Sequence, residues 1–180
     1  MSVVVRPNRK RTRLAFFDYA TGGAYFVTIC TENREHFFGE IHDDKMILND
    51  CGKIVVKCWQ EIPTHFPDTK LDEFVVMPNH IHGIVRIGNS INGVENAVNL
   101  ENADVGNGHA RSSSKKSNLS AILGSFKSAA SKEIHQKIRM DFAWQKSFHD
   151  HIIRDDEELN LIREYISSNP ENWAKDKNNF

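Results

Sequence analysis

The chain has 180 residues and a net charge of −1, and 39% of its residues are hydrophobic. This balance is expected for one soluble globular domain with a proper core, and no overall basic excess indicates a polyanion partner. The longest apolar runs are too short to cross a bilayer. Three cysteines in no metal-binding spacing, without a signal peptide, indicate a cytoplasmic protein with reduced thiols.

Residues 1–20 are expected to form a basic N-terminal arm. No acidic residue occurs among its first 13 positions. A solvated tail and an arm that contacts phosphates fit this pattern equally well. The basic side chains of the arm are Arg6, Arg9, Lys10, Arg11 and Arg13.

Aromatic and β-branched residues predict a first strand over 24–30, and a second, short strand is expected over 45–48. Asn49 or Asp50 can then cap a helix that runs to about Pro63. Apolar residues recur along this segment at the spacing of one helical face.

Residues 71–76 and 80–87 are predicted as two strands, joined by a connection short enough for an antiparallel hairpin. The second strand contains His80 and His82. Because side chains in a strand alternate faces, both imidazoles point to one side and Ile81 points to the other. Two such imidazoles can bind a divalent metal, although a single His-x-His pair also occurs by chance.

Residues 88–107 are rich in asparagine and glycine and show no clear period, so we expect an insertion over about 88–117. A helix should follow from Asn118 or Ser120 to about Ile138, with one apolar stripe. Its opposite side is basic, which fits either a solvated face or a phosphate-contacting surface. The candidate phosphate contacts in this basic stretch are Lys115 and Lys116 before the helix and Lys127 and Lys132 within it.

Residues 142–153 are predicted as another strand, which carries a second His-x-His pair, His149 and His151. The last helix should begin at the acidic cluster 155–158, whose carboxylates complement the positive end of the helix dipole. Asn169-Pro170 should end this helix. Beyond it, Trp173 is expected to pack back, and residues 175–180 are expected to be frayed.

The predicted order is strand, helix, two hairpin strands, helix, strand and helix. This order is close to the βαββαβ pattern, so we expect an α+β, ferredoxin-like or RRM-like antiparallel sheet with helices packed mainly on one face. Residues 21–175 are assigned to a single domain and residues 176–180 to a tail.

Tyr165 and Asn169 lie four residues apart, one turn along the same side of the last helix. Such a tyrosine is ordinarily a half-buried core residue with its hydroxyl in water. If it faces His80 and His82, a nearby dication would favour loss of the phenol proton and make it a nucleophile. Asn169 would then supply an oxygen as third ligand. Such a donor set suits Mg²⁺ or Mn²⁺ better than a closed thiolate zinc site.

The chain resembles the HUH single-tyrosine transposases, most of all their REP-associated branch, in three blocks: FVVMPNHIHGIV, NLSAILGSFKSAASKEI and WQKSFHDHIIRDDEELNLIREYISSNPENW. The resemblance implies that His80 and His82 bind the metal and that Asn169 completes the site. It implies that Tyr165 attacks a single-stranded DNA phosphate, forms a 5′-phosphotyrosine link and leaves a free 3′-OH. His149 then lies outside the metal motif, as does His151, and both are packing or DNA-facing residues.

We therefore expect a metal-dependent enzyme of DNA transposition and recombination that nicks and joins single-stranded or hairpin DNA from repeated palindromes. Arg154 joins the basic residues expected to contact the DNA backbone. A non-catalytic single-stranded nucleic-acid-binding module on the same sheet is the alternative. A metal hydrolase of small phosphoesters is a third possibility, without the glycine-rich phosphate loop that would support it. Monomer and homodimer both stay open.

Overall fold

The computed structural model describes residues 22–88 and 118–179. Its main sheet has four strands in the order β4-β5-β1-β6, and every neighbouring pair is antiparallel. The strands are β1 (Gly23–Cys30), β4 (Thr69–Met77), β5 (His80–Ile87) and β6 (His149–Ile153). The expected basic arm and the expected insertion, with Lys115 and Lys116, lie outside the described residues.

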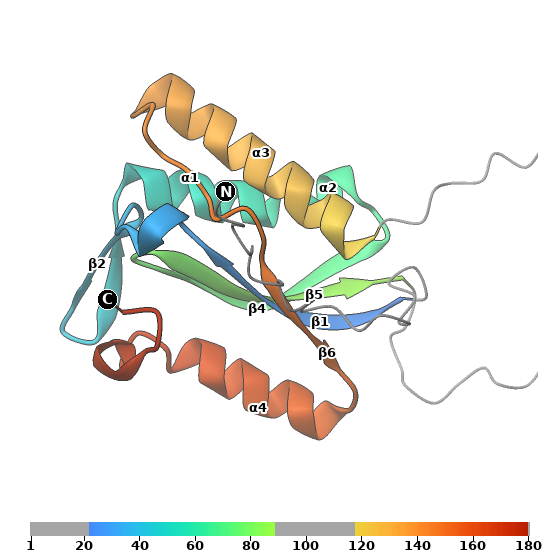
Figure 1. Cartoon of the computed structure of the whole chain (residues 1–180). Coiled ribbons are helices and arrows are strands. Elements are labelled where there is room, and N and C mark those ends of the chain that lie inside the picture. The colour runs from blue at the N-terminus through green and yellow to red at the C-terminus, as the bar shows by residue number, and fades with distance from the viewer. Residues whose placement is uncertain (1–21, 89–117, 180) are drawn as a thin grey trace, which may run out of the picture.

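Four α-helices cover the sheet: α1 (Asp50–Gln60), α2 (Ile62–His65), α3 (Leu119–Lys137) and α4 (Asp156–Ser167). Figure 1 shows α1, α2 and α3 on one face and α4 alone on the other. The expected α+β class is thus confirmed, with three helices on one face and the last one opposite. None of the helices in the described part of the chain has the length and apolar character needed to cross a membrane.

The alternation of side chains along the central strands separates two hydrophobic layers. Tyr25, Val27 and Ile29 are fully buried in the larger layer, beneath α1 and α3. Phe26 and Ile84 point the other way and pack in the smaller layer with the apolar face of α4. Because the strand period is two, this pattern also decides which face carries His80 and His82.

Side-chain caps start the three longer helices. Asn49 Oδ1 accepts a hydrogen bond from the Gly52 amide at 3.0 Å, and Asn118 Oδ1 accepts one from the Ala121 amide at 2.9 Å. Asp155 caps α4 through the Glu158 amide at 2.8 Å. Each cap pairs one of the amide groups that have no partner within the helix, so these starting positions follow from local sequence.

Smaller elements complete the fold. A separate hairpin pairs β2 (Gly39–His42) with β3 (Lys45–Leu48), and two short 3₁₀ helices occupy Glu32–Arg34 and Trp173–Lys175. The predicted helix from Asn49 to about Pro63 is divided, since α1 ends at Gln60 and α2 follows it.

The prediction of one strand over 142–153 is wrong for its first half, because only β6 pairs with β1. Residues 142–148 instead cross the edge of the larger layer, where the Phe142 ring meets Phe37 edge-on at 5.2 Å. Trp144 forms a single bridge to Thr31, and its indole N–H donates to the Lys127 carbonyl at 3.2 Å. The path of this segment is therefore decided by aromatic contacts, which lack the regular two-residue repeat of strand pairing.

Gly83 supplies a stability test, because β5 passes close beneath the ring of Trp59. A Cβ at position 83 would lie 2.5 Å from Trp59 Cζ2 and 3.1 Å from Phe74 Cβ. We expect Gly83→Ala to lower the free energy of unfolding by about 1–3 kcal/mol, because the buried rings must shift. Urea denaturation monitored by circular dichroism measures this change.

The matched control is Gly124→Ala in α3, where a Cβ would meet nothing within 4 Å. This change should raise the free energy of unfolding by about 0.5–1 kcal/mol, because alanine is the better helix former. Equal urea midpoints for the two variants would contradict the close approach of β5 to Trp59.

Candidate metal centre and tyrosine nucleophile

The candidate site is built on β5, between β4 and β1 in the sheet. His80 and His82 are 0% and 1% exposed and lie on the face that α4 covers. Their ring centroids are 4.5 Å apart. The strand period therefore brings the two imidazoles together on one side, as the sequence predicts.

Each imidazole has a hydrogen-bond partner at Nδ1. His80 Nδ1 lies 2.9 Å from Asn79 Oδ1, and His82 Nδ1 lies 2.9 Å from Thr28 Oγ1. Because an amide oxygen can only accept, His80 Nδ1 carries the proton and donates it, which leaves the Nε2 lone pair free. If His82 is also protonated at Nδ1, this nitrogen donates a hydrogen bond to Thr28 Oγ1. Its Nε2 then accepts a hydrogen bond from the Tyr165 hydroxyl at 3.3 Å.

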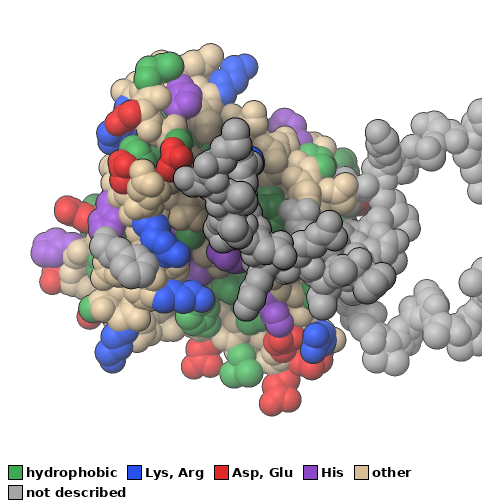
Figure 2. Space-filling model, viewed as in Figure 1, with side chains coloured by type: hydrophobic (Ala, Val, Ile, Leu, Met, Phe, Trp, Pro, Cys, Tyr) green, Lys and Arg blue, Asp and Glu red, His purple; other side chains and the backbone are tan. Residues whose placement is uncertain are grey.

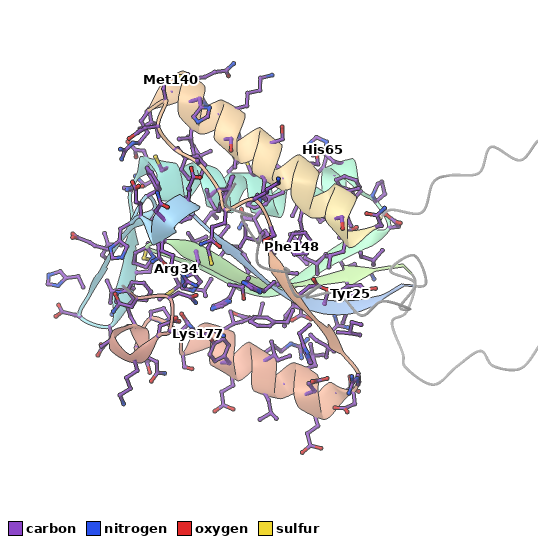
Figure 3. The ribbon with its side chains drawn as sticks, in the orientation of Figure 1. Tyr25, Arg34, His65, Met140, Phe148 and Lys177 are labelled. Atoms are coloured by element: carbon purple, nitrogen blue, oxygen red, sulfur yellow. The ribbon has the colours of Figure 1, made fainter. Side chains whose placement is uncertain are left out.

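Burial lowers the pKa of both histidines from 6.5 to about 3. For His80 the nearby Arg34 and Lys177 cations add to this effect, and for His82 the neighbouring His80 does. Figure 3 shows Arg34 and Lys177 toward the same end of the molecule, where the C-terminus lies. The rings are therefore neutral at neutral pH, the form in which imidazole binds a metal.

A third donor comes from the end of the chain. Asp176 has a side chain that is 3% exposed, and its Oδ2 lies 3.9 Å from His80 Nε2. One ligand atom from each of His80, His82 and Asp176 lies within 4.8 Å of the other two, so the three can hold a metal ion. The expectation of a frayed end is wrong for residues 175–179, because they pack against the sheet.

Two unpartnered atoms test the fit of a metal ion to this group. His80 Nε2 and Asn169 Oδ1 are both buried without a hydrogen-bond partner among the described residues. A buried polar atom without a partner costs about 1–3 kcal/mol, so a structure that retains such atoms calls for an explanation. A bound dication would satisfy lone pairs of this kind, and the nitrogen and oxygen donors fit a divalent ion.

Tyr165 lies on α4 and is 42% exposed. Its ring meets His82 at 5.3 Å and the edge of Phe26 at 6.0 Å. Burial raises the pKa of the phenol, the Asp176 carboxylate raises it further, and a hydrogen bond from Asn169 lowers it. The hydroxyl is therefore protonated at neutral pH and needs a nearby cation to become a good nucleophile.

An ion-pair cluster fastens α4 to the sheet beside this tyrosine. Asp72, at an irregularity in the β4 ladder, accepts hydrogen bonds from Arg163 Nε and Nη2, both at 2.7 Å. Arg86 Nη2 lies 2.8 Å from the same carboxylate. The hydrogen bonds from Arg163 lower the pKa of Asp72 to about 2, so the pair persists at neutral pH. Arg163 lies two residues before Tyr165 on α4, so this contact also restrains the helix that carries the phenol.

The second histidine pair lies two strands away from His82. Thr28 pairs with His82 on one side and with His149 on the other, which puts His149 on the same face at the sheet edge. The His151 side chain pairs with the Glu158 carboxylate, with 2.6 Å between His151 Nε2 and Glu158 Oε1. Neither residue belongs to the group that can hold a metal ion.

The predicted basic residues that the structure describes are not gathered at this site. Lys127 and Lys132 lie on α3, across the sheet from Tyr165, and Lys127 Nζ donates to the Gln145 carbonyl at 2.6 Å. Arg154 lies between β6 and α4. Figure 2 shows acidic side chains along the lower edge of the molecule, where α4 lies. The described part of the chain therefore has no continuous basic surface around Tyr165 made from the predicted residues.

The sequence indicates His80, His82, Tyr165 and Asn169 as candidates but does not indicate Asp176, which the structure puts beside His80. Asp176 lies beyond the last helix, in a stretch with no periodic pattern. The available signal was weak: an aromatic residue, Trp173, followed by a single carboxylate between two lysines. Only the return of the chain to β5 gives this carboxylate its neighbours.

Comparison with known proteins gives a relative in sequence and a similar fold among the solved structures. No family model matches the chain. A protein of Haemophilus influenzae, named only as uncharacterized, is 35% identical over 170 residues, which cover 94% of this chain and 92% of the relative. The structure of a REP-associated tyrosine transposase bound to a REP hairpin matches with a TM-score of 0.59 and 17% identity, over 94% of this chain and 77% of that one. The chain therefore belongs to the same family as the Haemophilus influenzae protein, and its fold is that of a REP-associated tyrosine transposase.

Proposed function

We propose that this protein is a metal-dependent single-stranded DNA endonuclease and strand transferase of the HUH single-tyrosine transposase type. One observation carries the proposal: the Tyr165 hydroxyl lies 3.3 Å from Nε2 of His82, one of the three residues that can hold a metal ion. The proposed nucleophile thus lies beside a group of residues that could hold a metal ion, which supports the proposal.

The proposed ligands are His80, His82 and Asn169, and the proposed ion is Mg²⁺ or Mn²⁺. The ion, when bound, would polarise a phosphodiester and neutralise charge that develops in its transition state. The neutral, buried imidazoles and the unpartnered Asn169 Oδ1 support this assignment.

In the proposed reaction, Tyr165 Oη attacks the phosphorus of single-stranded DNA. The new O–P bond joins the DNA 5′-phosphate to the tyrosine, the bond from phosphorus to the 3′ oxygen breaks, and that oxygen leaves as a free 3′-OH. The proton of the phenol is released, and the departing oxygen takes up a proton. Attack of another 3′-OH on the phosphotyrosine reverses these changes and joins two strands.

The residues around Tyr165 supply orientation. Phe26 holds one edge of its ring, and Asn169 hydrogen-bonds its hydroxyl. The contact between Asp72 and Arg163 keeps α4 against β4. Such fixed positioning is a large part of what an enzyme contributes to phosphoryl transfer.

The substrate is proposed as a DNA hairpin from palindromic repeats, because the structural neighbour was solved with a REP hairpin. The basic residues of the N-terminal arm, together with Lys115, Lys116, Lys127, Lys132 and Arg154, are proposed as backbone contacts. Counterion release would then make DNA binding weaken steeply with salt.

A non-catalytic DNA-binding module is the competing function. It would use the sheet and basic residues alone, and it would bind single strands equally well in EDTA. It gives no reason for two buried imidazoles, a buried carboxylate and a tyrosine to converge, since buried polar groups without partners destabilise a fold.

Replacement of Tyr165 by phenylalanine tests the nucleophile. The ring remains, so binding of a labelled single-stranded hairpin should be unchanged. The covalent product should disappear, because no hydroxyl is left to attack phosphorus. A denaturing gel after incubation with Mn²⁺ detects the wild-type product as a shifted, protease-sensitive band.

Tyr25→Phe is the matched control, because Tyr25 is fully buried in the hydrophobic layer on the opposite face of the sheet. This variant should form the covalent product as the wild type does. Continued adduct formation by Tyr165→Phe would refute the assignment of the nucleophile.

Metal binding should stabilise the folded protein through His80. Addition of Mn²⁺ at about 100 times its dissociation constant should raise the free energy of unfolding by about 2.7 kcal/mol. Thermal unfolding in the presence and absence of Mn²⁺ measures the shift, and EDTA should reverse it. His80→Ala should abolish it, whereas His42→Ala, whose side chain is 76% exposed, should retain it. A wild-type melting temperature that does not change on addition of Mn²⁺ would exclude this metal centre.

The buried imidazoles should also make the metal-free protein sensitive to acid. The folded-state pKa of about 3 lies below the ordinary value of 6.5, so the unfolded chain binds more protons between these values. Stability is therefore fully present above pH 6.5 and falls as the pH drops toward 3, by up to about 1.4 kcal/mol per pH unit for each histidine.

Urea midpoints of the metal-free protein from pH 7.5 to pH 4.5 measure this loss. We expect a shallower pH dependence for His82→Gln than for wild type, and an unchanged one for His42→Ala. Parallel curves for wild type and His82→Gln would show that burial of the ring does not control its protonation.

A further inference from the structure

We propose that Asp176 is a protein ligand of the metal centre and that ion binding holds the C-terminal segment, residues 173–179, against the sheet. This inference rests on the proposed function, since it concerns the same ion. It adds a donor outside α4 and gives the end of the chain a part in the site.

The position of the Asp176 carboxylate is the first observation. Its side chain is 3% exposed, and the 3.9 Å between its Oδ2 and His80 Nε2 is too long for a hydrogen bond. Two ligands of one ion, each about 2.1 Å from it, lie about 3.0–4.2 Å apart. The carboxylate thus lies at the separation that a shared cation requires and not at the separation of a direct contact.

The charge of the group favours the same role. Two neutral imidazoles and an amide oxygen provide no negative charge for a dication. The Asp176 carboxylate is the only acidic side chain in the group that can hold a metal, within the described part of the chain. Affinity for Mg²⁺ or Mn²⁺ increases with the number of charged oxygen ligands, so loss of this carboxylate should weaken binding more than loss of a neutral donor.

Asn79 connects the C-terminal segment to the metal-binding histidine. Its Oδ1 accepts a hydrogen bond from His80 Nδ1 at 2.9 Å, and its Nδ2 donates one to the Asn178 carbonyl at 2.7 Å. Asn178 Oδ1 also accepts from Arg34 Nη1. The same buried asparagine therefore orients the imidazole and fastens the segment two residues after Asp176.

Trp173 secures the other end of the segment. Its ring stacks on His80, with 6.0 Å between centroids and 30° between planes, and it meets His36 at 5.6 Å. Asp176 is thus flanked on both sides by residues that contact His80 or its partner. Movement of the segment would change the surroundings of His80, and an ion held by both would restrain the segment.

Asn169 differs from Asp176 in its neighbours. It hydrogen-bonds the Tyr165 phenol, so removal of its amide would disturb the nucleophile as well as the ion. Asp176 acts on the phenol only through its charge. A variant of Asp176 therefore separates metal binding from positioning of the nucleophile more clearly than a variant of Asn169.

Metal binding and docking of the segment are then coupled, and the coupling is reciprocal. Ion binding should slow opening of the segment, and a segment without its carboxylate should bind the ion less tightly. This relation can be measured without DNA and without catalysis.

The test compares the full-length wild type with Asp176→Asn, a change that removes the charge and keeps the shape. Isothermal titration with MnCl₂ should show an affinity at least about tenfold weaker for the variant. Hydrogen exchange of the backbone amides in residues 173–179 should slow on addition of Mn²⁺ in the wild type and should change little in the variant. Glu171→Gln, an exposed acid near the same segment, is the matched control and should behave as wild type.

Asp176→Glu keeps the carboxylate and should retain more affinity than Asp176→Asn, even if both variants lose some stability. Wild-type affinity and wild-type slowing of exchange in Asp176→Asn would overturn the role of Asp176 and leave a His80-dependent metal centre intact. Equal affinities of the Asn and Glu variants would also overturn it. A wild-type protein that binds no Mn²⁺ would remove the proposed metal centre itself, which is a different result.

Discussion

The burial of two neutral imidazoles side by side on a central strand is the constraint to which the rest of the site is fitted. Because both rings are buried away from solvent, each ring nitrogen needs a partner within the protein or a bound ion. Asn79 and Thr28 occupy the Nδ1 atoms, which turns the two Nε2 atoms toward the space between β5 and α4. One of these receives the Tyr165 hydroxyl, and the other has no hydrogen-bond partner within the described residues.

The fold meets this constraint with elements from distant parts of the chain. The β4–β5 hairpin sets the spacing of the histidines, and β1 contributes Thr28 through its register with His82. The pairing of Asp72 with Arg163 brings α4 across the sheet, so that Tyr165 reaches the same place. The two hydrogen bonds from Arg163 to the partly buried Asp72 carboxylate restrain the orientation of α4, because a bidentate contact fixes geometry as well as distance.

The C-terminal segment completes the enclosure. Trp173 covers His80, Asn178 is held by Asn79, and Asp176 lies between them beside the unpartnered Nε2. The site is thus assembled from a hairpin, a helix and a chain end that are far apart in the sequence.

The sequence by itself determined the elements that have a local cause. Aromatic and β-branched residues predicted β1, β4 and β5, and polar capping residues predicted helix starts near positions 49, 118 and 155. The alternation of side chains along a strand put His80 and His82 on one face. The tertiary structure alone decided the course of residues 142–148, the placement of α4 opposite the other helices, and the presence of Asp176 beside His80. The reason is physical: hydrogen-bond periods and caps act over a few residues, whereas aromatic packing and the pairing of buried charges depend on residues that only the folded chain brings together.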